Sequence, residues 1–134
     1  MSASPQDLQQ AHRSSLWTPF FQMETVRREG TVIFERAEGV RLWDVEGREY
    51  LDAHGSLWLA NVGFGRAEII EAVYEQMKRL PYFSMFAGYS NPRAIELAVR
   101  LLELTRPEGM GKVFFSDSGS EAVETALKLA RQYW

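Results

Sequence analysis

The chain has 134 residues, of which 46% are hydrophobic and 25% charged, and this composition excludes a disordered or collagen-like protein. Its net charge of −3, with acidic and basic residues mixed along the sequence, excludes the basic face that binding to DNA or RNA requires. The absence of cysteine excludes disulfides, thiolate nucleophiles and zinc sites built on cysteine. The sequence contains no apolar stretch long enough for a membrane span and no signal-peptide core in residues 1–10, so we expect a cytoplasmic protein.

The first predicted element is a short helix near the N-terminus. Ser4 and Pro5 have the pattern of an N-cap followed by proline at the first helical position, and the helix is expected to end near His12. The segment 16–21 is aromatic and is interrupted by Pro19, so it fits neither a helix nor a central strand. We expect this segment to lie extended over another surface.

The pattern changes to short strands from Thr31 onward. Turns at Gly39 and Gly47 separate three runs rich in β-forming residues, which cover residues 31–36, 40–43 and 49–51. These runs predict a three-stranded antiparallel meander. A loop punctuated by glycines follows between Gly55 and Gly65.

Two amphipathic helices are predicted next, because apolar residues recur at spacings of three and four. The first covers residues 66–80. The second begins at the cap formed by Asn91 and Pro92 and runs to about Thr105. An aromatic loop, residues 81–90, connects the two helices.

The last predicted elements are a strand, a tight turn and a helix. The apolar run 112–116 is typical of a buried strand, and the helix begins near Gly119. Its apolar side is expected to face inward, and Glu124 and Lys128 form an i, i+4 pair on the outer side. No C-cap pattern precedes Trp134, so we expect the helix to continue beyond it.

The junction before this helix, Ser118-Gly119-Ser120-Glu121, is the strongest candidate for a binding site. The first turn of a helix has free N–H groups and carries the positive end of the helix dipole, and both favour a phosphate dianion. Gly119 lets the backbone approach such an anion closely. Ser118 and Glu121 also have the spacing of a capping box, which explains them without a ligand. The two interpretations are compatible.

Other polar candidates have ordinary structural explanations. His12 and His54 are the only histidines and lie in unrelated segments, so no metal site is expected. Asp52 and Asp117 could form an acid–base pair, but aspartates beside glycine turns more often shape the turn.

Three loop aromatics leave two interpretations open. Phe20, Trp58 and Phe86 either pack in a core or line a pocket, as aromatics beside glycines in loops often do. No G-x-S-x-G or G-x-G-x-x-G motif occurs, which argues against a serine hydrolase and a dinucleotide site.

Three blocks of sequence, in this order along the chain, resemble the N-terminal third of class III aminotransferases of the amine:pyruvate (omega-transaminase) branch. The blocks are Gly39–Gly47, Leu57–Arg66 and Phe115–Ala122, and the resemblance extends over residues 16–134. It implies an α/β fold, namely the N-terminal part of a fold type I transferase that depends on pyridoxal 5′-phosphate (PLP).

The resemblance also implies a domain division and a cofactor site. Residues 1–65 would hold the meander of the small domain, and residues 66–134 would begin the large α/β/α cofactor-binding domain. In this family the N–H groups at Gly119 and Ser120, with the Ser120 hydroxyl and the cap at Ser118, hold the phosphate of PLP.

The aromatic candidates match substrate-site positions of the family. Trp58 matches the tryptophan that lines the amine pocket, and Phe20 matches an aromatic at the mouth of that pocket. Phe86 matches an aromatic that is contributed across a dimer interface, so a homodimer is implied. One departure is Ser56, where the family often has glycine.

The activity implied by the resemblance is transfer of an amino group from an amine or omega-amino acid to pyruvate. The chain has three lysines, Lys78, Lys112 and Lys128, and none of them matches the catalytic lysine of the family. The 134-residue chain alone is therefore expected to lack catalytic residues and to be inactive. Two alternatives remain open, namely an ornithine-type or semialdehyde-type class III enzyme and a non-catalytic interaction module.

Overall fold

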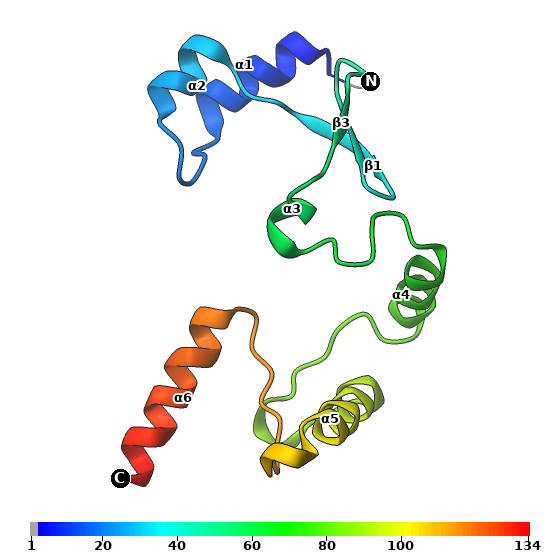
Figure 1. Cartoon of the computed structure of the whole chain (residues 1–134), viewed down its shortest axis with the longest axis vertical. Helices are drawn as coiled ribbons and strands as arrows, with labels where there is room; N and C mark the ends of the chain where they lie inside the picture. The colour runs from blue at the N-terminus through cyan, green and yellow to red at the C-terminus, as the bar shows by residue number, and fades with distance from the viewer. Residues whose placement is uncertain (1–2) are drawn as a thin grey trace. The chain divides into compact units, whose positions relative to one another are not determined.

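The computed structural model describes residues 3–134, which group into two compact units that divide between Arg79 and Leu80. The first unit contains, in chain order, α1 (Pro5–Ser15), α2 (Met23–Glu29), β1 (Phe34–Glu38), β2 (Arg41–Asp44), β3 (Glu49–Leu51), α3 (Gly55–Trp58) and α4 (Ala67–Arg79) (Figure 1). The second unit contains η1 (Phe86–Gly88), α5 (Pro92–Leu104), η2 (Arg106–Glu108) and α6 (Gly119–Tyr133). The domain boundary implied at Gly65 stays a prediction.

The first helix, α1, begins at the predicted cap. The Ser4 hydroxyl accepts a hydrogen bond from the Asp7 N–H at 3.1 Å, and the Ser4 N–H donates to the Asp7 carboxylate at 3.2 Å. The predicted N-cap is confirmed, and the reciprocal capping box with Asp7 adds to it. The helix continues one turn past His12 to Ser15. The helix α2 was not predicted; it packs against α1 and buries Val26 completely.

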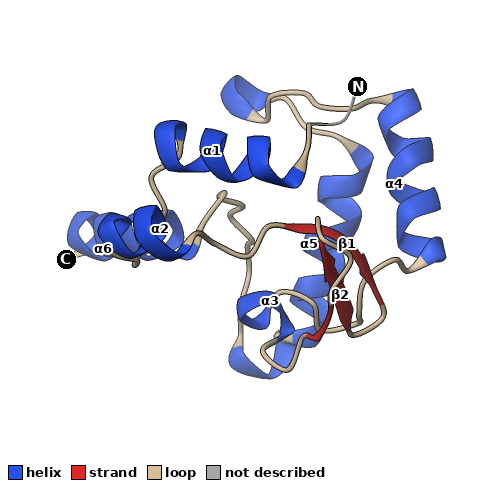
Figure 2. Ribbon diagram, turned by 90° about the horizontal axis from the view of Figure 1, so that it is seen from above, coloured by secondary structure: helices blue, strands red, loops and turns tan. Residues whose placement is uncertain are grey.

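The three strands form the predicted antiparallel meander, in the order β1-β2-β3 (Figure 2). The first strand begins at Phe34 instead of Thr31. The side-chain amide of Gln9 explains this correction, because it donates to the Thr31 carbonyl at 2.5 Å and accepts from the Thr31 N–H at 3.3 Å. A side chain on α1 therefore satisfies the backbone groups that a neighbouring strand would otherwise bind.

A buried aspartate stabilises the turn between β2 and β3. Asp44 is 2% exposed and accepts hydrogen bonds from the N–H groups of Glu46 and Arg48, at 3.0 and 2.9 Å. Its second oxygen accepts from Arg48 Nε at 2.7 Å and from the Tyr50 hydroxyl at 2.9 Å. Burial raises the pKa of this carboxyl, but the four hydrogen bonds outweigh burial and lower the pKa to about 2.

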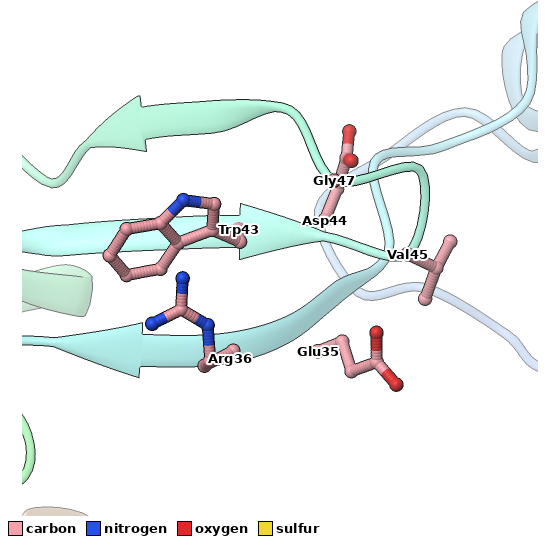
Figure 3. Close-up of a pocket in the computed structure, with 6 residues that line it drawn as sticks. All are labelled: Glu35, Arg36, Trp43, Asp44, Val45 and Gly47. Atoms are coloured by element: carbon pink, nitrogen blue, oxygen red, sulfur yellow. The ribbon is translucent and has the colours of Figure 1, made fainter.

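The sheet carries a cation–π contact between β1 and β2. Figure 3 shows the Arg36 guanidinium lying over the ring of Trp43, 3.4 Å from the ring centre. Glu35, Val45 and Gly47 complete the shallow hollow around this pair and Asp44. The contact joins β1 to β2 and covers part of an otherwise exposed indole.

The loop that follows β3 is closed back onto the turn between β1 and β2. The Asp52 N–H donates to the Val40 carbonyl at 2.9 Å, where the loop begins. At its other end, Gly39 and Phe64 exchange two backbone hydrogen bonds, of 3.0 and 2.8 Å. A Cβ on Gly63 would lie 3.0 Å from the Gly39 carbonyl oxygen, so glycine is required for this close approach.

The three longer helices, α4, α5 and α6, form as predicted. The Asn91 side chain caps α5 by accepting from the Ala94 N–H at 3.0 Å, and Lys128 pairs with Glu124 at 2.8 Å on α6. The expected burial of the inner side of α6 is not found, since Leu127 is 66% exposed. In the residues that the structure describes, no helix combines the length and apolar character that crossing a membrane requires.

One predicted strand is absent. Residues 112–116 have no regular secondary structure and belong to no sheet, and Phe114 is 68% exposed. A buried strand requires a neighbouring strand for its backbone groups, and the described strands all pair within the first unit. The apolar run 112–116 is therefore not a strand in this structure.

Candidate cofactor and substrate site

The start of α6 has the geometry of a capped helix. Ser118 has an extended backbone, with φ −149° and ψ 161°, and its hydroxyl accepts a hydrogen bond from the Glu121 N–H at 3.3 Å. The Glu121 carboxylate accepts from the N–H of Asp117 at 2.9 Å, one residue earlier than a capping box requires. The predicted cap at Ser118 is therefore present, with the carboxylate turned toward the preceding residue.

The same turn leaves two donors for a ligand. Within residues 3–134, no atom accepts a hydrogen bond from the N–H groups of Gly119 or Ser120. A Cβ added to Gly119 would meet no atom within 4 Å, so the space beside these groups is open. The helix behind them has 15 residues and directs its positive dipole end at this space. These residues fit a phosphate dianion.

The element that carries Trp58 is a left-handed turn. The backbone φ angles of Gly55, Ser56, Leu57 and Trp58 are 56°, 46°, 62° and 68°. Helical hydrogen bonds close the turn, from the Trp58 N–H to the His54 carbonyl at 3.1 Å and from the Leu59 N–H to the Gly55 carbonyl at 2.7 Å. Left-handed helical backbone costs a residue with a Cβ roughly 1–2 kcal/mol, so such a turn requires support from its surroundings.

That support comes from Asp52. One carboxylate oxygen accepts from the Ser56 N–H and the other from the Ser56 hydroxyl, each at 3.0 Å. The hydrogen bond from the Ser56 N–H is the main cause of a lowered pKa at Asp52. Of the two roles considered for Asp52 in the sequence, the structure shows the turn-forming one. Its partnership with Ser56 was not predicted, because it depends on the left-handed backbone of the turn, which brings the Ser56 N–H to the Asp52 carboxylate.

Trp58 is exposed at the end of this turn. Its side chain is 73% exposed, and its ring lies 5.5 Å from the His54 ring at an angle of 58°. The structure therefore does not place Trp58 in a core within the described residues. His54 contacts this aromatic ring, and residues 3–134 contain no cluster of acidic and histidine side chains that could hold a metal ion.

The other two aromatic candidates also lie on loops. Phe20, in the first unit, is fully exposed and has a φ of 54°. Phe86, in the second unit, is 84% exposed and opens the short helix η1, in which Ala87 has a φ of 57°. The three aromatics thus occupy three separate loops, whereas Ser118, Gly119 and Ser120 share one turn.

Backbone strain is concentrated at these predicted aromatic sites. In the described part of the chain, every residue other than glycine with positive φ lies in one of the three loops: Phe20, Ser56, Leu57, Trp58 and Ala87. Such strain persists only where the surrounding structure holds it, and it clusters at functional sites.

The second unit contains a hollow that the sequence did not reveal. Phe86 lines it together with Ala94 and Ile95 of α5, and with Phe114 of the segment that leads to α6. The apolar stripe of α5 predicted which side of the helix would make contacts, but not that Phe86 and Phe114 would line a hollow beside it. One hollow therefore joins the Phe86 loop to the segment 113–115.

Comparisons with known proteins identify the family of the chain. Residues 23–134 match the class-III aminotransferase family. The chain is 40% identical over 133 residues to a putrescine–pyruvate aminotransferase of Pseudomonas aeruginosa, covering 99% of this chain and 29% of that protein. It is 44% identical over 130 residues to an adenosylmethionine-8-amino-7-oxononanoate aminotransferase of Aquifex aeolicus, covering 97% of this chain and 28% of that protein.

Solved structures of aminotransferases contain the same fold. An (S)-enantioselective omega-transaminase from Thermomicrobium roseum matches with a TM-score of 0.92 and 39% identity, over 100% of this chain and 30% of that one. An amine transaminase from an uncultivated Pseudomonas species, in a PLP-bound form, matches with a TM-score of 0.83 and 40% identity, over 90% of this chain and 27% of that one.

The predicted fold class is thereby confirmed. The chain corresponds to the N-terminal part of a PLP-dependent transaminase and spans less than a third of the length of the relatives it matches. The chain belongs to the class-III aminotransferases.

Proposed function

We propose that this chain supplies the phosphate anchor and part of the amine pocket of a PLP-dependent transaminase that transfers amino groups from amines or omega-amino acids to pyruvate. The observation that carries the proposal is the start of α6, where the free N–H groups of Gly119 and Ser120 face open space. The membership of the chain in the class-III aminotransferases gives this anion site its expected ligand, the phosphate of PLP.

The turn at Ser118 would hold the phosphate in three ways. The N–H groups of Gly119 and Ser120 donate to it, the Ser120 hydroxyl adds a donor, and the dipole of α6 favours its negative charge. The Ser118 hydroxyl is already bound to the Glu121 N–H, so its role is to fix the turn. When bound, PLP supplies an electron sink for proton removal next to the amine nitrogen. The protein residues orient it.

The three loop aromatics would form part of the amine site. Aromatic walls favour amines with apolar or extended side chains over purely acidic ones, because an acidic group loses its hydration against them. The backbone strain at Phe20, Trp58 and Ala87 supports a functional role for these loops. The omega-transaminase and the putrescine–pyruvate aminotransferase among the relatives support an amine donor and pyruvate as acceptor.

We further propose that the complete protein is a homodimer, in which Phe86 extends toward the site of the neighbouring subunit. The exposure of this side chain, at 84%, supports a contact outside the described residues. The cytoplasmic location inferred from the sequence stays a prediction.

A second candidate function is supported by one comparison. The chain is 44% identical to an adenosylmethionine-8-amino-7-oxononanoate aminotransferase, so a class-III enzyme with another pair of substrates is the leading alternative. An ornithine-type or semialdehyde-type enzyme belongs to the same group of alternatives. In the non-catalytic alternative, the turn at Ser118 is only a helix cap.

These candidates are separated by assays on a full-length protein that contains this sequence. The purified protein would be loaded with PLP and incubated with pyruvate and either putrescine or an arylalkylamine, and alanine would be measured. The proposal expects alanine from at least one amine. Amino transfer from S-adenosylmethionine to 8-amino-7-oxononanoate, without alanine formation, would favour the second candidate. A protein that does not bind PLP would leave only the non-catalytic one.

A further inference from the structure

The left-handed turn α3 is the least expected piece of backbone in the described chain. Gly55 adopts positive φ freely, but the next three residues each carry a Cβ. Nothing within the turn offsets that cost apart from its own helical hydrogen bonds. The turn therefore depends on contacts from outside its four residues.

We propose that Asp52 is a positioning residue for Trp58: its carboxylate holds the turn Gly55–Trp58, and this fixes the indole as a wall that limits the size of the amine. The inference rests on the proposed function, since the role of Trp58 in the amine pocket belongs to that proposal. It adds a residue that does not touch the amine and acts through Trp58.

The hydrogen bonds of Asp52 are directed at the first strained residue. Its two oxygens bind the N–H and the hydroxyl of Ser56, each at 3.0 Å, so both the backbone and the side chain of Ser56 are held. The Asp52 N–H is in turn bound to Val40 at the end of the sheet. A short chain of hydrogen bonds thus connects the sheet to the start of the turn.

Only one residue separates Ser56 from Trp58. The Trp58 N–H donates to the His54 carbonyl at 3.1 Å, and the Trp58 ring lies 5.5 Å from the His54 ring. The far end of the loop is held by the Gly39–Phe64 bridge. The backbone around Trp58 is therefore held on both sides. The hydrogen bonds between Asp52 and Ser56 are the interactions that a single substitution can remove.

Ser56 explains why this chain needs the aspartate. At a φ of 46° a glycine would adopt the turn without help, whereas serine adopts it against a steric cost. The serine hydroxyl in return gives Asp52 a second hydrogen bond that glycine could not offer. In a Ser56→Gly variant the turn should persist with less dependence on Asp52.

The position of Trp58 can be measured by fluorine NMR. The full-length protein, loaded with PLP, would be labelled with 5-fluorotryptophan, and the Trp58 resonance assigned by its loss in Trp58→Phe. We expect Asp52→Ala to shift and broaden this resonance and to leave that of Trp43 unchanged. Asp52→Asn keeps an oxygen that accepts from the Ser56 N–H, and should restore most of the original signal. An unchanged Trp58 resonance in Asp52→Ala would overturn the inference.

Amine selectivity tests whether the position matters. The ratio of kcat/KM for a bulky and a small amine would be measured in the original protein, Asp52→Ala, Trp58→Ala and the double variant. We expect Asp52→Ala to change the ratio in the same direction as Trp58→Ala, by about threefold or more, and the double variant to match Trp58→Ala. Equal loss for both amines in Asp52→Ala would contradict a positioning role.

The two proposals fail in different ways. If Trp58→Ala leaves the ratio unchanged, the amine-pocket role of Trp58 in the proposed function is wrong, and the selectivity part of the inference falls with it. If Trp58→Ala changes the ratio but Asp52→Ala does not, only the inference is wrong. If Asp52→Ala does not fold, Ser56→Ala replaces it in both measurements. This variant removes the hydrogen bond from the Ser56 hydroxyl and keeps the one from the Ser56 N–H. We then expect smaller changes in the same directions.

Discussion

The Tyr50 hydroxyl on β3 donates a hydrogen bond of 2.9 Å to the buried carboxylate of Asp44 at the end of β2. The same carboxylate accepts hydrogen bonds from Arg48 and from the N–H of Glu46, so one side chain binds several donors of the turn between β2 and β3. This turn precedes the loop that carries Trp58, and it fixes the strand from which that loop departs.

We predict that Asp44→Ala lowers the thermal midpoint of the full-length protein more than Tyr50→Phe does. The aspartate variant leaves several donors unpaired near a buried position, whereas the tyrosine variant removes one donor and keeps the ring contact with Phe34. Circular dichroism on heating measures both midpoints. Equal midpoints in the two variants would contradict the central role of Asp44.

The Asp44 carboxyl also predicts a pH dependence. Its pKa in the folded protein is about 2, below the ordinary value of 3.8, so folding favours the ionised form. The stability that this group contributes is complete above pH about 4 and is lost as the pH falls toward 2. Urea unfolding between pH 5 and pH 2 should show a steeper loss in the original protein than in Asp44→Asn, which has no carboxyl to titrate. Parallel curves would show that another group causes the loss.

Local patterns predicted most of the elements, because their causes lie within a few residues. Ser4 with Asp7 and Asn91 with Ala94 are caps separated by three residues, and the structure confirms both. The meander was recognised from its turns for the same reason.

The predictions that were wrong or missing depend on contacts between residues that are distant in the sequence. The first strand begins late because Gln9 binds Thr31, 22 residues away. The left-handed turn at Trp58 lies in a loop that is closed by backbone pairing of Gly39 with Phe64, and no local pattern indicates that pairing. The run 112–116 has the composition of a strand, but pairing requires a partner that composition cannot supply.

For the candidate site, the sequence indicated the turn at Ser118 and the resemblance indicated the three aromatics. The hydrogen bonds between Asp52 and Ser56 were not predicted, because they depend on the positive φ angles of the turn.

Ser118 and Ser120 should differ in what they affect. Ser118→Ala removes the cap of α6 and should lower the free energy of unfolding by about 1 kcal/mol. Ser120→Ala should leave folding nearly unchanged but weaken PLP binding by roughly tenfold to 150-fold, because a hydrogen bond to a charged group contributes about 1.5–3 kcal/mol. Fluorescence titration with PLP measures the second effect, and Ser14→Ala on α1 is a matched control. Unchanged PLP affinity in Ser120→Ala would count against the phosphate site.

The 134-residue chain, purified alone, should form no alanine from an amine and pyruvate. None of its lysines lies on a loop of the candidate site. Lys78 is on α4, Lys112 is in the segment that leads to α6, and Lys128 is on α6, where it pairs with Glu124. The reaction requires such a lysine to move a proton. Alanine production measured by chromatography, at a rate above that of PLP alone, would refute this prediction.

The most direct test is a crystal structure of the full-length protein with PLP bound. It should place phosphate oxygens about 3 Å from the backbone nitrogens of Gly119 and Ser120, within hydrogen-bonding distance. A structure in which the cofactor lies elsewhere, or in which packed side chains close the start of α6, would contradict the account.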